Sequence, residues 1–137
     1  MVEVNYLAVL LAAASSMVVG SIWYAESVFG KTWQKLAKVK IGDQGMAYPL
    51  GITALVSLVT AFVLAHVIYL SNSFFENSFL QDSLMTAFWL WLGFTAARII
   101  THDAFEGRRK KLTLMNISHE LVTLLVMGLI IGLFGRP

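Results

Sequence analysis

The chain has 137 residues, of which 58% are hydrophobic and 13% charged, and it contains no cysteine. A soluble domain carries about 25% charged residues, and helices that are apolar on every side belong in membranes or deep cores. The composition therefore predicts an integral membrane protein with a single domain over residues 1–137, and it excludes disulfides, thiolate zinc sites and thiol nucleophiles.

The first predicted membrane span covers residues 4–25, and we expect it to be retained because no basic segment of a signal peptide precedes it. Small residues recur in it at four-residue intervals, a spacing that lets another helix approach closely. We expect this face to pack within the chain, with a contact between two copies of the chain as the alternative. The residues are Ala8, Ala12, Ser16 and Gly20.

A short amphipathic helix is predicted after the first span. Lys31, Lys35 and Lys38 recur at helical spacing, which suits a helix lying on the membrane surface with its lysines directed toward anionic headgroups. The second span is predicted over residues 49–71. It begins with a proline, which the first turn of a helix tolerates.

The third and fourth spans are predicted over residues 83–105 and 112–134, joined by a tight basic turn. Nine of the ten Lys and Arg residues lie in this turn, at Arg98 close to it, or between residues 26 and 48, and only Arg136 lies on the other side. The positive-inside rule then places both basic connections in the cytoplasm and both termini outside. Because topology explains the basic residues, we expect no nucleic-acid partner.

These spans predict an all-α fold, namely a bundle of four transmembrane helices with a short amphipathic cytoplasmic helix after the first span. The fourth span carries a polar face, because Asn116, His119, Glu120 and Thr123 are spaced i, i+3, i+4 and i+7. Ionisable groups at this depth are costly, usually face a protein interior or a watery cavity, and tend to be functional.

Arg98 is the predicted partner of Glu120. In an antiparallel hairpin, residues equidistant from the turn lie at similar depth, and both residues are about 16 Å from the turn at 1.5 Å per residue. Two interpretations stay open with equal weight: an ion pair that fixes helix register, or a polar pocket that handles protons or solutes. Additional candidates for the polar site are Asn5, Glu26, His66 and His102, of which His66 is expected to be a hydrogen-bonded structural residue.

Signatures of catalysis and of cofactors are poorly represented. The serines lack a nucleophile-elbow context, and phosphate-cradling glycine loops and a haem attachment site are absent from the sequence. The spacing of Asn116, His119 and Glu120 hints at metal ligands, but no second ligand motif recurs. We therefore assign no catalytic residue, metal or cofactor, and an enzyme is the weaker hypothesis.

Several motifs resemble a known family of membrane proteins, domain of unknown function 1761. The resemblance implies a small four-helix bacterial membrane protein and no assigned activity. The family pattern has Tyr-His where this chain has His119-Glu120, which would make an ion pair of Glu120 particular to this sequence. The motifs are Asn5-Tyr6-Leu7-Ala8-Val9, Gly20-x-x-Trp23-Tyr24-x-x-x-x-Phe29-Gly30-x-x-Trp33, the Trp89/Trp91-Gly93-Phe94 region, Met115-Asn116, Leu121-Val122 and Val126-Met127-Gly128.

Three functional hypotheses follow. The first is a small transporter or channel-like homo-oligomer that lines a path with the polar face. The second is an accessory or scaffold subunit that docks a larger membrane complex through Trp23, Trp33 and the basic turn. The third is a membrane enzyme acting on a lipid or quinone, with His119 and Glu120 as acid and base. The expected partners are the lipid bilayer and further copies of the chain, packed through small-residue faces that include Gly128-x-x-x-Gly132.

Overall fold

The structure is a computed structural model that describes residues 2–137, and this part of the chain is helical apart from short connections. Four helical segments in the described residues are long and apolar enough to cross a membrane. These segments are compatible with a multi-pass membrane protein, and the predicted all-α class is confirmed. The segments are α1 (Tyr6–Trp23), α3 (Ala47–Phe75), the continuous run of α4, η1 and α5 (Phe79–Phe105), and α6 (Lys110–Phe134).

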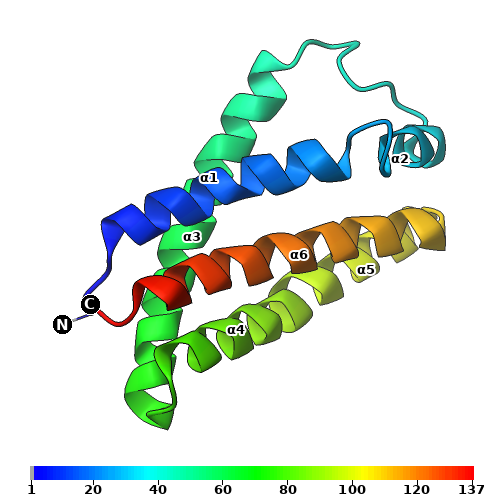
Figure 1. Cartoon of the computed structure of the whole chain (residues 1–137). Coiled ribbons are helices and arrows are strands. Elements are labelled where there is room, and N and C mark those ends of the chain that lie inside the picture. The colour runs from blue at the N-terminus through cyan, green and yellow to red at the C-terminus, as the bar shows by residue number, and fades with distance from the viewer. Residues whose placement is uncertain (1) are drawn as a thin grey trace.

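Helix α6 lies at the centre of the bundle, where it packs against α1 and α4, and α1 packs in turn against α3. Both termini lie at one end of the molecule, which we call the far end (Figure 1). The short helix α2 (Gly30–Ala37) and the turn between α5 (Ala97–Phe105) and α6 lie at the other end, which we call the basic end. The core between the helices is apolar and includes Val9, Ala12, Leu64, Ile68, Met127 and Ile131.

The small-residue faces are packed within the chain. Ser16 on α1 is buried and its Oγ lies 2.6 Å from the Oγ of Ser57 on α3. A Cβ placed on Gly128 would come within 3.0 Å of the Ser83 carbonyl oxygen, and one on Gly132 within 2.8 Å of Leu80 on α4. These glycines therefore allow α4 and α6 to approach closely, and self-association of the chain would need other surfaces.

Helix α3 diverges from the bundle in its N-terminal half (Figure 1). Residues 47–56 are all exposed, and Ser57 is the first buried residue of this helix. The basic half of the molecule is therefore formed mainly by α1, α2, α5 and α6.

A π-helical turn, η1 (Trp91–Ala96), separates α4 (Phe79–Leu90) from α5. Such turns are rare and are frequently found at functional sites. The indole Nε1 of Trp91 donates a hydrogen bond of 2.8 Å to the carbonyl oxygen of Ile117. This contact fixes η1 against α6 at the level of the polar face.

The structure contradicts the predicted ion pair between Arg98 and Glu120. Arg98 is exposed, and among the described residues Glu120 has its ion-pair contact with His119 instead. In a continuous α-helix Arg98 would lie about three turns after Ala87, on the face packed against α6. The extra residue of the π-turn moves that face by one position, so that Ile99 is half-buried and Asp103 buried while Arg98 points away.

Candidate functional site

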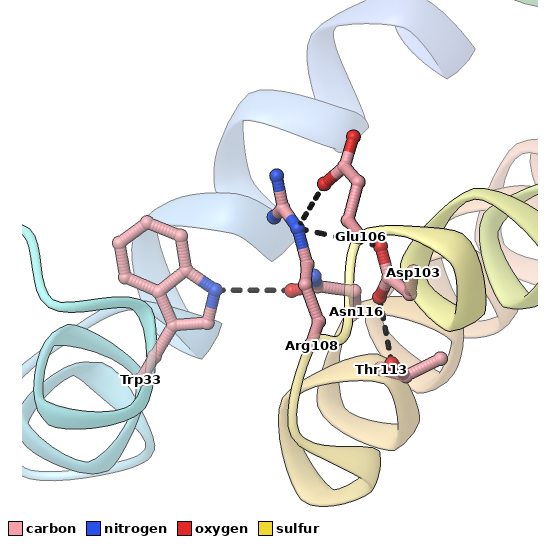
Figure 2. A network of polar contacts seen from close by, with 6 residues as sticks. All are labelled: Trp33, Asp103, Glu106, Arg108, Thr113 and Asn116. Carbon is pink, nitrogen blue, oxygen red and sulfur yellow. Dashed lines mark hydrogen bonds and ion pairs between the residues drawn. The ribbon is translucent and has the colours of Figure 1, made fainter.

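The polar face of α6 meets α1 and α2 at the basic end of the bundle. Trp33 on α2 donates a hydrogen bond of 3.0 Å from its indole Nε1 to Oδ1 of Asn116 on α6 (Figure 2). Asn116 is thus bonded to a side chain of another helix. We call the surrounding group the basic-end cluster, and it consists of Trp23, Tyr24, Trp33, Asn116, His119, Glu120 and Thr123.

Aromatic rings enclose the imidazole of His119. The ring centroids of Trp23 and Tyr24 lie 5.9 Å and 5.0 Å from that of His119. Tyr24 also packs edge-on against Trp33, at 5.3 Å between centroids. Gly20 borders the imidazole, because a Cβ at this position would lie 3.8 Å from Nε2 of His119, in ordinary van der Waals contact.

The chain returns sharply after α1, and this return brings the aromatic side chains together. Gly30 begins α2 directly beneath the end of α1, where an added Cβ would collide with the carbonyl oxygen of Tyr24. Only glycine fits such a close approach of two backbone segments. The spacing of aromatic residues and glycines between residues 20 and 33 therefore determines which side chains pack around His119.

His119 and Glu120 form a pair in which the imidazole is largely buried and the carboxylate is partly exposed. Nδ1 of His119 lies 3.2 Å from Oε1 of Glu120, and their side chains are 14% and 39% exposed. An imidazole and a carboxylate in contact can take up and release a proton or hold a cation. The pair therefore combines a buried ring with an accessible acid inside an apolar segment.

Three buried polar atoms of the basic-end cluster have no hydrogen-bond partner among the described residues: Nε1 of Trp23, Nε2 of His119 and Oγ1 of Thr123. Buried polar groups are normally hydrogen-bonded, and leaving one unpaired costs about 1–3 kcal/mol. Their gathering around one histidine makes the cluster a place where a polar ligand or water would find unused donors and acceptors.

The remaining predicted site residues lie outside the basic-end cluster. Asn5 is the N-cap of α1, and its Oδ1 accepts a hydrogen bond of 3.1 Å from the backbone N–H of Ala8. Nδ1 of His66 lies 2.8 Å from the carbonyl oxygen of Phe62 in its own helix, as expected of a structural residue. The other three candidates have exposed positions: Glu26, Arg98 and His102.

A second polar group at the basic end was not predicted from the sequence. Asp103 is buried and accepts a hydrogen bond of 2.7 Å from Thr113, and its other oxygen lies 3.6 Å from Nε of Arg108 (Figure 2). Arg108 also donates to Glu106 at 2.6 Å, and this hydrogen bond raises the pKa of the Arg108 guanidinium. The positions of Asp103 and Thr113 on either side of Gly107 are the signal that could have revealed this contact.

The far end holds another polar group, which we call the far-end cluster: Asn72, Ser73, Asn77, Asp82 and Arg136. Asp82 is 3% exposed, and its carboxylate accepts hydrogen bonds of 2.8 Å from Asn72 and 2.9 Å from Asn77. Arg136 donates to Oδ1 of Asn72 at 3.3 Å and to Ser73 at 3.0 Å. This group ties the C-terminus to the connection between α3 and α4.

Metal ligation finds no support in residues 2–137, where no group of three or more His, Cys, Asp or Glu side chains is placed to hold an ion. The acids and histidines are distributed over separate clusters instead. The side chains of the basic-end cluster themselves can supply hydrogen bonds, proton exchange and contact with aromatic rings.

The aromatic and glycine string of residues 20–33 and the residue Asn116 thus converge on one site. The sequence pattern of the family described as "Protein of unknown function (DUF1761)" matches residues 7–132. The chain belongs to the DUF1761 family. Comparisons with curated proteins and with solved structures gave no match. The predicted resemblance is confirmed, and three residues that carried it, Gly20, Trp23 and Tyr24, lie next to His119.

Proposed function

We propose that this DUF1761 protein is a small transporter or channel-like protein, with the basic-end cluster as its site for a proton or a small polar solute. The observation that carries the proposal is the set of three unpaired buried polar atoms around His119. Glu120 beside them keeps 39% of its side chain exposed. Intramembrane acids and histidines that face a cavity commonly mark ion and substrate pathways.

The shape of the bundle supports the same proposal. The residues of α3 that precede Ser57 lie outside the bundle. The basic half of the molecule is therefore less enclosed than the far half. A solute that reaches Glu120 would find the carboxylate first and the imidazole of His119 behind it. The polar face of α6 would then form one wall of its route.

Proton flux into proteoliposomes tests the proposal. We expect the wild-type protein to dissipate a pH gradient, read with an entrapped pH-sensitive dye, and Glu120→Gln to lower the rate by at least about fivefold, because the proton acceptor is lost. Glu76→Gln, at an exposed position between α3 and α4, is the matched control and should keep the wild-type rate. Wild-type flux equal to that of empty liposomes, for protons and for a panel of small solutes, would refute the proposal.

For the orientation, we propose that the basic end faces the cytoplasm of a bacterial cell and that both termini lie outside its inner membrane. The positive-inside rule supports this arrangement, since the lysines and arginines gather at α2 and at the turn before α6. The chain has no cysteine, so labelling of a single introduced cysteine shows on which side of the membrane that position lies. Ser78→Cys should react with an impermeant maleimide added to intact cells and Gly42→Cys should not; the opposite pattern would reverse the orientation.

An accessory subunit of a larger complex is the second candidate, favoured by the exposed N-terminal half of α3. Residues 47–56 are all exposed and therefore have no close packing partner within the described chain. They include the apolar residues Leu50, Ile52 and Leu55. A partner helix could cover this surface in place of lipid. Purification in mild detergent decides: a co-purifying membrane subunit supports this candidate, whereas a lone homo-oligomer removes its support.

A further inference from the structure

A cleft of about 500 Å³ opens between α2 and the turn that joins α5 to α6. It is separate from the buried polar atoms around His119, although Trp33 contributes to both. The side chains that matter for its chemistry are Trp33, Lys38, Glu106, Arg108, Arg109 and Leu112.

The cleft is positively charged. Lys38, Arg108 and Arg109 contribute three cations to its walls, against the single carboxylate of Glu106. That carboxylate is already engaged, because it lies 2.6 Å from Nε of Arg108 (Figure 2). The contacts of Arg108 with Asp103 and Glu106 both use this one nitrogen, so its two terminal nitrogens are available to a further acceptor.

The cleft lies at the level where membrane spans end. Helix α5 ends at Phe105 and α6 begins at Lys110, and the cleft is built from the residues between them and from the end of α2. Apolar side chains, including Trp33 and Leu112, line it beside the cations. A site of this kind offers charge to a headgroup and apolar surface to the carbon atoms next to it.

We propose that this cleft binds the phosphate of an anionic phospholipid. Lys38, Arg108 and Arg109 contact the phosphate oxygens. Trp33 and Val39, which also lines the cleft and is exposed, contact the glycerol and the first acyl carbons. Basic pockets beside transmembrane helices are suited to anionic headgroups, and arginine pairs with phosphate through several parallel hydrogen bonds. An inorganic phosphate ion would use the cations but leave the apolar wall without a contact.

A bound lipid would also touch the candidate transport site through a single residue. Trp33 lines the cleft and at the same time donates its hydrogen bond to Asn116. The lipid would therefore hold α2 against α6 and keep the wall of the basic-end cluster in place. This lipid site does not depend on the transport proposal, because its binding is measured without flux.

The test uses the full chain in a neutral detergent and follows tryptophan fluorescence during titration with short-chain phosphatidylglycerol. We expect saturable binding, with a half-saturation concentration at least about tenfold lower than for the matching phosphatidylcholine. Inorganic phosphate at the same concentrations should not compete. The double variant Lys38→Gln/Arg109→Gln should raise the half-saturation concentration by about tenfold.

The matched control is Lys40→Gln/Lys110→Gln, which removes the same charge from exposed positions outside the cleft walls. It should change the half-saturation concentration by less than about twofold. Equal effects of the two double variants would mean general electrostatic attraction and would overturn the proposal. Equal binding of both lipids, or full competition by phosphate, would overturn it as well. Circular dichroism confirms that each variant keeps its helices.

Discussion

The two ends of the bundle differ in whether their buried polar groups have hydrogen-bond partners. At the far end, both oxygens of the Asp82 carboxylate accept hydrogen bonds, and Arg136 closes the group from outside. At the basic end, polar atoms of Trp23, His119 and Thr123 are buried without partners among the described residues. The same chain therefore pairs its polar groups fully in one place and leaves them unpaired in another.

This difference separates a structural role from a binding role. A satisfied polar network rigidifies a structure, whereas an unsatisfied one lowers stability and is retained where a ligand or a reaction needs it. On this reasoning the far-end cluster locks the connection between α3 and α4 to the C-terminus. Under the proposed function, the basic-end cluster keeps its hydrogen-bonding capacity for a solute.

The largest expected effect concerns the far-end cluster. Asp82→Ala removes the buried carboxylate that accepts hydrogen bonds from Asn72, which is itself buried, and from Asn77. We expect a loss of about 3 kcal/mol in the free energy of unfolding. Denaturation in detergent micelles, followed by circular dichroism, measures it. Asp43→Ala, in an exposed connection, should change stability by less than about 0.5 kcal/mol. Similar losses in the two variants would remove the structural role of the far-end cluster.

The next effect in size concerns two glycines, one between α4 and α6 and one beside His119. Gly128→Ala should cost about 2 kcal/mol, because the new methyl group meets Ala87 and the Ser83 carbonyl at 3.0 Å. Gly20→Ala should leave stability unchanged or raise it by up to about 1 kcal/mol, because the methyl group finds free space 3.8 Å from His119. It should nevertheless reduce proton flux, because the methyl group would lie against Nε2 of His119. An unfolded Gly20→Ala variant would show that this space is not free.

The smallest effect is expected for a hydroxyl without a partner. Thr123→Val removes an unpaired buried oxygen, so stability should stay the same or rise by up to about 1 kcal/mol. Ser16→Ala removes a buried hydroxyl that lies 2.6 Å from Ser57, and it should lower stability by about 1 kcal/mol. Thermal unfolding in the same detergent compares them. A loss for Thr123→Val as large as that for Ser16→Ala would mean that Thr123 has a structural partner.

Much of the fold could be predicted from the sequence, because membrane spans are local features. The apolar runs and the lysines at helical spacing predicted four spans and a short helix, and the structure has α2 at Gly30–Ala37. The polar face of α6 was predictable for the same reason, since residues at i, i+3, i+4 and i+7 share a face whatever surrounds them. Its contact with α2 through Asn116 depended on the return of the chain after Tyr24.

The rest required the structure because it depends on rotation about helix axes and on long-range contacts. Equal distance from the turn gave Arg98 and Glu120 the same depth, but the π-turn at Trp91–Ala96 rotated Arg98 away from α6. No local pattern marks that turn in advance. The contact between Asn72 and Arg136 spans 64 residues, and such pairs are not visible in a hydrophobic pattern.

The most direct test of the binding role is an experimental structure of the protein in lipid, resolved well enough to show water and small ligands around His119. We expect non-protein density within hydrogen-bonding distance of Nε2 of His119 and Oγ1 of Thr123, reached from the side of Glu120. A dry site in which these atoms and Nε1 of Trp23 are paired with other protein groups would contradict it.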